Sequence, residues 1–261
     1  MTERPTTAST SVTHRVRANS HPSEQQAANA AREAHESGLN SRGGGTAHES
    51  GLNSRGGGTA PEQFWEDFYR ERDQIWTGNA NKTLVSEVTG LPAGTALDLG
   101  CGEGGDAIWL AQQGWQVTAV DVSATALERG ARHAADAGVR ITWERHDLQT
   151  SFPAGTFDLV SAQFLHSPVE RPDERPTILR KAAAAVAPGG VLVIGSHAHW
   201  PTWVTTPPHD VVFPTIEQML AQLDLGPEWE VEAAGLITSP SKSPDGVEGE
   251  RADSVLRIRR G

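Results

Sequence analysis

The sequence predicts an α/β fold with a mostly parallel β-sheet, and three observations support this prediction. Short apolar segments alternate with helical segments of 10–15 residues, which is typical of βαβ units. The apolar segments, such as VTAV, LVSA and VLVIG, suit strands that are covered on both faces. All 8 tryptophans lie after residue 60, so the material for a core is confined to the later part of the chain.

The first sixty residues differ in composition from the rest. They contain no Phe, Trp, Tyr, Ile or Cys, and they carry a perfect tandem repeat, AHESGLNSRGGGT, at 34–46 and 47–59. Such a segment buries too little apolar surface to offset the entropy of ordering it. We therefore predict a disordered tail at 1–60 and one folded domain at 61–261.

The first half of the domain contains four helices and three strands in this interpretation. An aromatic face formed by Phe64, Trp65, Phe68 and Tyr69 indicates the first helix. The following elements are a short helix at 81–88, a strand at 96–100, a helix at 106–113, a strand at 116–121, a helix from the N-cap Ser123 to about 137, and a strand at 139–145.

The second half continues the alternation. We expect a strand at 156–162, an alanine-rich helix at 176–186 that Pro188-Gly189-Gly190 stops, and a strand at 191–195. A short helix at 215–223 and strands at 228–234 and 254–259 follow. Ligands of such sheets bind beyond the carboxyl ends of the strands.

Charge and composition exclude several classes of function. The chain has a formal charge of −11, and residues 61–261, with 16 basic and 28 acidic residues, carry −12. This balance disfavours nucleic-acid binding, which needs clustered basic residues. A single cysteine, Cys101, excludes an internal disulfide and a cysteine-rich zinc site. The longest wholly apolar run, 182–187, is far too short to span a membrane, so we expect a soluble cytoplasmic protein without membrane contact.

A glycine-rich loop, LDLGCGEGGD at 97–106, follows a predicted strand and opens a helix. Gly100, Gly102 and Gly105 fit the dinucleotide fingerprint, and Asp121, 21 residues after Gly100, stands where an acid would bind a ribose. This spacing alone does not identify the nucleotide. Asp98 does favour one answer, because its carboxylate would repel a pyrophosphate and attract an ammonium group.

The end of the third strand adds a second distinguishing feature. Asp147 can accept a hydrogen bond from an adenine amino group, and the backbone N–H of Leu148 can donate to a ring nitrogen.

Together the segments LDLGCGEGGDAIWLA, VTAVDVS, HDL, FDLVSAQFLH and VAPGGVL resemble class I S-adenosylmethionine-dependent methyltransferases. Within that superfamily, residues 61–261 are similar to the small-molecule branch with tellurite-resistance and thiopurine methyltransferase-like proteins. The upstream WTGNAN at 76–81 is also similar to that branch. The resemblance implies a Rossmann-like seven-stranded sheet with helices on both faces and the last strand antiparallel.

The resemblance also implies S-adenosyl-L-methionine as the cofactor and a set of residues that bind it. Asp98, Gly100, Cys101, Gly102 and Gly104 would face its methionine part, Asp121 the ribose, and Asp147 and Leu148 the adenine. Val122 would also belong to the cofactor-binding residues. Trp76 would belong to an N-terminal lid, where an aromatic face near the sulfonium is favourable. We expect Cys101 to be a small loop residue rather than a nucleophile.

The loops after the fourth and fifth strands would form the acceptor site. They hold His166, His197, His199 and His209, four of the six histidines after residue 60, and the sequence HAHWPTW adds two tryptophans. We interpret them as an aromatic, histidine-lined cup for a small molecule, with His166 as candidate base or as a hydrogen-bonded support of its loop. The H-x-H pair with His209 could bind a metal, but we expect none.

Two other functions stay open at the sequence level. A nicotinamide-dependent oxidoreductase shares the glycine pattern, and a cofactor-binding module without turnover would share the whole pocket. Methylation of bases is disfavoured, because Ser161-Ala-Gln-Phe164 stands where such enzymes carry an Asn/Asp-Pro-Pro-aromatic motif. The predicted aromatic cup suits a thiol, an aromatic amine or a metalloid oxyanion as acceptor. The sequence does not identify the oligomeric state.

Overall fold

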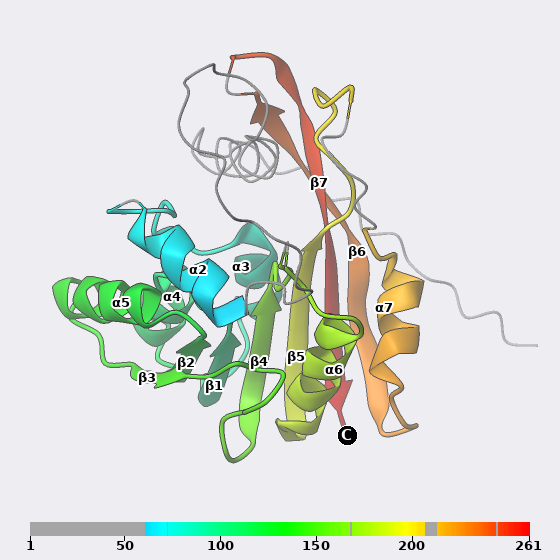
Figure 1. The fold of residues 1–261 in the computed structure, drawn as a ribbon. Coiled ribbons are helices and arrows are strands. Elements are labelled where there is room, and N and C mark those ends of the chain that lie inside the picture. Colours follow the sequence, from blue (N-terminus) through cyan, green and yellow to red (C-terminus); the bar gives the residue numbers. More distant parts are fainter. Residues whose placement is uncertain (1–60, 72, 168, 207–212, 244) are drawn as a thin grey trace, which may run out of the picture.

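The computed structural model describes residues 61–261 except 72, 168, 207–212 and 244. The predicted disordered tail, 1–60, lies outside the described residues, and the division at residue 60 stays a prediction. The described part forms a seven-stranded sheet in the order β3-β2-β1-β4-β5-β7-β6 (Figure 1). β7 pairs antiparallel with both β5 and β6, while the other neighbouring strands pair in parallel. The predicted Rossmann-like α/β fold is confirmed.

The strands are β1 (Thr95–Leu99), β2 (Gln116–Asp121), β3 (Thr142–Arg145), β4 (Phe157–Gln163), β5 (Val186–His197), β6 (Trp229–Lys242) and β7 (Glu248–Arg260). The helices are α2 (Pro61–Arg70), α3 (Lys82–Val88), α4 (Gly105–Gln112), α5 (Ala124–Asp136), α6 (Glu174–Ala184) and α7 (Ile216–Leu223).

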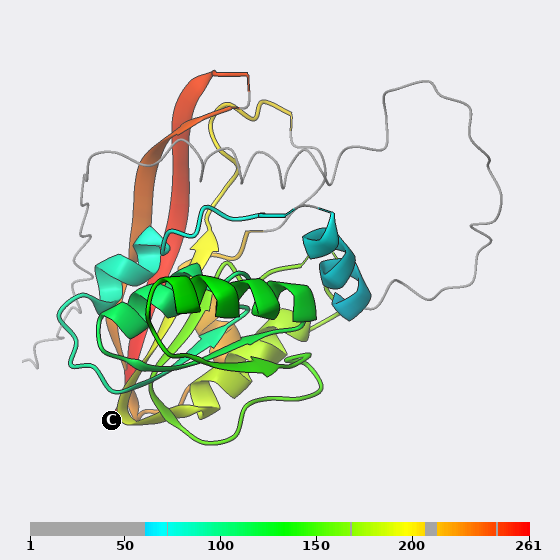
Figure 2. The ribbon, with the colours of Figure 1, turned by 90° about the vertical axis from the view of Figure 1, so that its left-hand side faces the viewer.

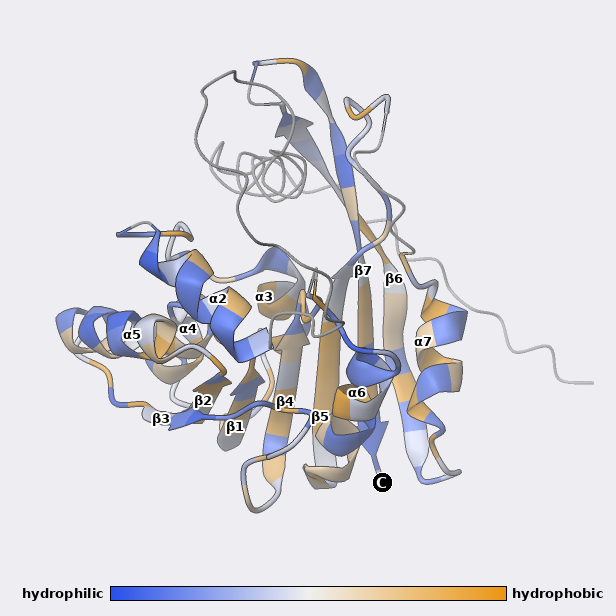
Figure 3. Cartoon of the chain, in the orientation of Figure 1, coloured by the Kyte–Doolittle hydropathy of each residue, from blue (hydrophilic) through white to orange (hydrophobic). Residues whose placement is uncertain are grey.

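Alternation along each strand divides the core into two layers. In β1, Leu97 packs into the layer that contains α6 and α7, whereas its neighbour Ala96 packs into the layer that contains α3 and α4. Figure 3 shows the hydrophobic strands β4 and β5 in the middle of the sheet, with more polar helices outside them. Asp98 stands on the same side as Ala96, at the end of a buried strand.

Helix α2 lies over the carboxyl edge of the sheet, against α5, as Figure 2 shows. Its aromatic face joins a small cluster with Ile75, Trp76 and Ala126. A segment that precedes the sheet in sequence therefore covers the edge at which the glycine loop lies.

The hairpin β6–β7 is much longer than the sequence predicts. We expected strands at 228–234 and 254–259, but β6 and β7 stay paired as far as Lys242 and Glu248. β5 pairs with β7 only as far as His197 with Asp253, so the outer half of the hairpin rises beyond the sheet (Figure 1). This half is polar and half-exposed, and no apolar run marks it in the sequence.

The predicted bounds of three other elements, β3, α6 and β5, were also wrong. The predicted strand 139–145 begins only at Thr142, because the N–H of Val139 still bonds to Ala134 at the end of α5. Helix α6 begins earlier than expected, at Glu174, and ends at Ala184, before Pro188-Gly189-Gly190. These three residues lie within β5, where its register against β4 shifts, and Gly189 adopts a left-handed φ of 79° there.

Within the described ranges, no helix is both long and apolar enough to cross a membrane.

Candidate functional site

The glycine loop connects β1 to α4 and approaches β2. Gly102 has a φ of 53° and donates its N–H to Asp121 Oδ2 at 2.9 Å. The second oxygen of Asp121 accepts from the N–H of Ser123 at 2.9 Å. Asp121 therefore fixes the loop as well as standing at the predicted ribose position, and each of its oxygens can still accept another hydrogen bond.

The proposed N-terminal lid, residues 61–81, contacts this loop directly. A Cβ at Gly102 would come within 2.8 Å of the Tyr69 hydroxyl and 3.1 Å of Trp76 Nε1, so only glycine fits there. Trp76 Nε1 also donates to the Tyr69 hydroxyl at 2.9 Å. The structure thus places Trp76 beside the glycine loop, and its contact with the cofactor stays a prediction.

Glu103, which the sequence analysis overlooked, anchors the lid. This buried carboxylate accepts from the N–H groups of Ile75 and Trp76 at 3.1 and 3.0 Å. It also pairs with the buried Arg129 of α5 at 2.9 Å. The position of Glu103 between loop glycines could have indicated this role in the sequence. A buried carboxylate in a glycine loop needs hydrogen-bond donors from other segments of the chain.

Asp106 anchors the next part of the lid in the same way. Its two oxygens accept from the backbone and side-chain nitrogens of Asn81, at 2.6 and 2.8 Å. Because Asn81 precedes α3, this carboxylate holds the start of that helix beside the glycine loop.

Asp98 is the most unusual group in the site. It is 2% exposed, and its Oδ2 finds no hydrogen-bond partner among the described residues. Burial, and after it the negative charge of Asp106, raise the pKa of Asp98 well above its ordinary value, although Ser161 donates to it. A buried acid without a full set of donors is costly to the fold, and a cationic ligand would compensate for that cost.

Cys101 lies between these acids. Burial and the neighbouring Asp121 raise the pKa of its thiol well above the ordinary value. The thiol form is favoured, and the expectation that Cys101 is a small loop residue rather than a nucleophile stays a prediction.

The predicted adenine residues have protein partners of their own. Both oxygens of Asp147 lie 3.0 Å from Arg171 Nη2, an ion pair that the sequence analysis did not anticipate. Leu148 is buried in the core beneath α6, and the carbonyl of Val122 accepts from Arg145 at 2.9 Å. Arg171 therefore already uses part of the hydrogen-bond accepting capacity of Asp147 that we assigned to the adenine amino group.

A second cluster lies beyond the ends of β4 and β5. Phe164 adopts a left-handed φ of 52°, which is rare for a residue with a side chain, and its ring centroid lies 4.6 Å from that of His197. The exposed ring of His166 lies 5.2 Å from the ring of His197. The two loops that the sequence analysis assigned to the acceptor therefore do meet.

The long hairpin completes this cluster with charged residues. Asp253 is 5% exposed, and its Oδ1 lies 2.9 Å from His197 Nδ1. Arg251 binds its Oδ2 through Nε and Nη2, at 3.0 and 2.9 Å. The guanidinium of Arg251 also lies over the ring of Phe164, 5.9 Å from its centroid.

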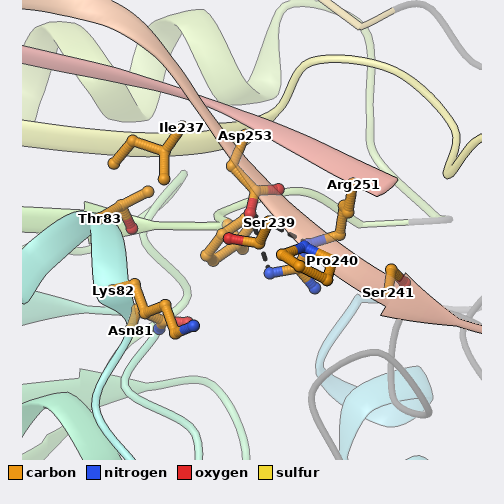
Figure 4. A pocket seen from close by; sticks show the side chains of 10 residues that line it. Asn81, Lys82, Thr83, Ile237, Ser239, Pro240, Ser241, Arg251 and Asp253 are labelled. Carbon is orange, nitrogen blue, oxygen red and sulfur yellow. Dashed lines mark hydrogen bonds and ion pairs between the residues drawn. The ribbon is translucent and has the colours of Figure 1, made fainter. Parts of the chain in front are cut away.

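A pocket opens between the start of α3 and the hairpin (Figure 4). Its lining includes Lys82, Phe164, Arg251 and Asp253, and the hydroxyl-bearing Thr83, Ser239 and Ser241. Thr83 donates to Gln163 at 2.7 Å, Gln163 to Ser161 at 3.4 Å, and Ser161 to Asp98. A chain of buried polar side chains thus links this pocket to the glycine loop.

No three His, Cys, Asp or Glu side chains in the described residues gather as a metal site would require. His197 of the H-x-H pair is engaged with Asp253, and His199 Nδ1 lies 2.6 Å from the carbonyl of Trp200. His209 lies outside the described residues.

Comparison with known proteins identifies the central part of the chain. Residues 96–190, from β1 into β5, match the family model for a methyltransferase domain. This segment therefore resembles a methyltransferase domain. The predicted resemblance to class I methyltransferases is confirmed by this match together with the strand order.

Two relatives support the same assignment. An uncharacterized methyltransferase of Mycobacterium tuberculosis is 35% identical over 126 residues, which cover 47% of this chain and 60% of the relative. A ubiquinone biosynthesis O-methyltransferase of Methylobacterium nodulans is 36% identical over 102 residues, covering 39% of this chain and 40% of its own length. The chain thus spans 60% or less of these two relatives.

The magnesium protoporphyrin IX methyltransferase of Synechocystis, solved with bound S-adenosylhomocysteine, has the same fold. The match has a TM-score of 0.55 at 17% identity and covers 77% of this chain and all of the other.

Proposed function

We propose that this protein is an enzyme that transfers a methyl group from S-adenosyl-L-methionine to a small-molecule acceptor by in-line displacement. The observation that carries the proposal is the buried Asp98, with one oxygen lacking a partner among the described residues. The ammonium group of the cofactor's methionine part would supply the missing charge and donors. Nothing in a dinucleotide's pyrophosphate would do so, because phosphate and carboxylate repel each other.

The residues around Asp98 suit the rest of this cofactor. Asp121 retains capacity to accept from ribose hydroxyls, and Trp76 contributes an aromatic surface beside Gly102. Val122, Asp147 and Leu148 follow the ends of β2 and β3, the edge where the adenine is proposed to bind. When bound, the cofactor supplies an electrophilic methyl group on a sulfonium.

The chain's own contribution is to position the acceptor and exclude water. α2 and the segment to Trp76 cover the glycine loop, and the buried Glu103 holds that segment in place. A methyltransferase domain with a partly matching O-methyltransferase relative, and a net charge of −12 over residues 61–261, favours a small molecule over a nucleic acid as acceptor.

A protic acceptor also needs a proton acceptor in the protein. His166 is the candidate that the sequence provides, and it is exposed. His197 is the candidate favoured by geometry, because its contact with the buried Asp253 can fix a proton on Nδ1 and leave Nε2 as the base.

Transfer of a labelled methyl group tests the proposal. The full chain would be incubated with S-adenosylmethionine carrying a tritiated methyl group and a panel of phenols, thiols, aromatic amines and metalloid oxyanions. We expect the label in at least one small product, together with one S-adenosylhomocysteine for each methyl group transferred. Binding of S-adenosylhomocysteine without labelled product on any acceptor would instead favour a binding module without turnover.

A further inference from the structure

The buried Arg175, in the first turn of α6, connects the two segments that carry the candidate bases. Its Nε donates to the carbonyl of Leu165 at 3.0 Å, and its Nη2 donates to Ser196 Oγ at 2.6 Å. Leu165 directly precedes His166, and Ser196 directly precedes His197. One guanidinium therefore joins the loop after β4 to the last residues of β5, next to both histidines.

Leu165 also connects this arrangement to the glycine loop. Its Cδ1 would lie 2.7 Å from a Cβ at Gly100, so its side chain packs directly against that glycine. The backbone beside it is tightly turned, because the N–H of Phe164 donates to the Gly195 carbonyl at 2.8 Å and the N–H of His166 donates to the Phe164 carbonyl at 2.9 Å. Holding the Leu165 carbonyl therefore limits how far this loop can move relative to the glycine loop.

Helix α7 shields the contact from water. The fully buried Met219 of this helix places its Sδ 3.7 Å from Arg175 Nη2 and 3.9 Å from Ser196 Oγ. A hydrogen bond that is shielded in this way is electrostatically stronger than one in water.

Neither packing nor helix stability accounts for an arginine at this position. Apolar side chains, such as Ile178 and Leu179, fill the layer beneath the same helix. Burial lowers the pKa of the Arg175 guanidinium, and the negative charge of Glu170 offsets this only in part. A cation in the first turn is also disfavoured by the helix dipole. Because burying a charge is costly, the property that this position uses is the fork of donors, which reaches acceptors in two different segments.

We propose that Arg175 is a positioning residue for methyl transfer, which holds the loop after β4 and the end of β5 in place beside the glycine loop. This inference rests on the proposed function and goes beyond it, because Arg175 would act through Leu165 and Ser196 and not through contact with a ligand. A displacement of the reacting groups by about 1 Å can cost on the order of a hundredfold in rate. Turnover should therefore depend on Arg175 more than cofactor affinity does.

Two replacements of Arg175 separate positioning from packing. Arg175→Met keeps a long side chain that suits the apolar layer, and Arg175→Lys keeps the charge without the fork. With an acceptor found by the labelled-methyl assay, both should lower kcat by about ten- to a hundredfold. The Kd for S-adenosylhomocysteine, measured by calorimetry, should change by less than about twofold. Arg180→Met, which removes an exposed arginine of the same helix paired with Asp173, is the matched control and should leave kcat unchanged.

Amide hydrogen exchange on the ligand-free chain gives a second readout, which needs no acceptor. In both Arg175 variants, peptides that cover residues 163–167 should exchange about tenfold faster than in the wild type, because their turn loses its anchor. Peptides from α5 and all peptides of Arg180→Met outside α6 and α7 should exchange at the wild-type rate.

Several results would overturn the inference. One is an unchanged kcat in both Arg175 variants, and another is unchanged exchange in residues 163–167. A loss of S-adenosylhomocysteine affinity as large as the loss of kcat, an equal loss of kcat in Arg180→Met, or failure of both Arg175 variants to fold would make the role of Arg175 structural. If the wild-type chain does not bind S-adenosylhomocysteine, the proposed function fails, and the exchange measurement still decides whether Arg175 holds the loop.

Discussion

The proposed cofactor side and the proposed acceptor side of the sheet edge are built in different ways. On the cofactor side, the glycine loop, Asp98 and Asp121 come from one βαβ unit, and the buried side chains are acidic. On the acceptor side, Phe164, His197 and Arg251 come from three distant segments and include basic and aromatic groups. The buried acids of the first region suit the ammonium group of a cationic cofactor, whereas the second region combines basic and aromatic side chains.

The largest expected effect is a loss of folding stability on the proposed cofactor side. Glu103→Gln should destabilise the protein by about 3–5 kcal/mol, because it removes the carboxylate that pairs with the buried Arg129 and loosens the lid at Trp76. Urea unfolding followed by tryptophan fluorescence measures this.

Glu62→Gln is the matched control on the same lid. Glu62 pairs with Arg145 through exposed side chains, 56% and 47% accessible, so the cost should stay below about 1 kcal/mol. Equal costs for Glu103 and Glu62 would contradict the view that the lid depends on a buried anchor.

Acid should weaken the contact between α2 and α5. Burial alone would raise the pKa of Glu66, but hydrogen bonds from Thr125 and Ser123 outweigh it and lower the pKa to about 2. A lowered acid pKa stabilises the fold above its ordinary value of 4.5, and this stabilisation is lost as the pH falls towards 2. The linked free energy is on the order of 3 kcal/mol.

Unfolding of the wild type and Glu66→Gln between pH 6 and pH 2 isolates this contribution. The difference in stability between the two proteins should shrink as the pH falls, since the other acids titrate alike in both. A difference that is constant with pH would mean that Glu66 does not hold the lid through its charge.

The two histidines test the acceptor side. With an acceptor found by the labelled-methyl assay, His197→Ala should lower turnover about a hundredfold and flatten the acidic limb of the pH profile. His166→Ala should have a smaller effect, because its ring is exposed whereas His197 contacts the buried Asp253.

Asp253→Asn provides a second measurement on the same pair. Removing the carboxylate that favours the charged imidazole should move the acidic limb to lower pH. If His166→Ala alone removes the limb, then the base is His166, as the sequence analysis proposed.

The smallest expected effect is a gain in stability. Asp98→Asn should stabilise the protein without ligand by ~1–2 kcal/mol, measured near pH 7, because it removes a buried acid that lacks donors. Burial and Asp106 raise the pKa of Asp98 in the folded protein. The folded wild type therefore becomes less stable as the pH rises above about 4, whereas the variant has no such dependence at this position. The same variant should bind S-adenosylhomocysteine more weakly, and a stabilised variant with intact binding would contradict the role of Asp98.

The glycine loop is easier to recognise in the sequence than the cluster around Phe164, for physical reasons. Glycines with left-handed φ and an acid two residues earlier are local features, so the loop from Asp98 to Gly104 could be recognised directly. The pairing of Asp147 with Arg171 and of Glu103 with Arg129 depends on tertiary packing across 24 and 26 residues. Arg251 and Asp253 were beyond prediction, because the hairpin that carries them is stabilised by backbone pairing and not by an apolar pattern.

Calorimetric titration of the wild-type chain with S-adenosylhomocysteine, NAD and NADP tests the central claim most directly. The claim is that the glycine loop receives a ligand with an ammonium group beside Asp98. S-adenosylhomocysteine should bind while both dinucleotides fail to bind under the same conditions. Tight binding of NAD or NADP, with S-adenosylhomocysteine ignored, would contradict it.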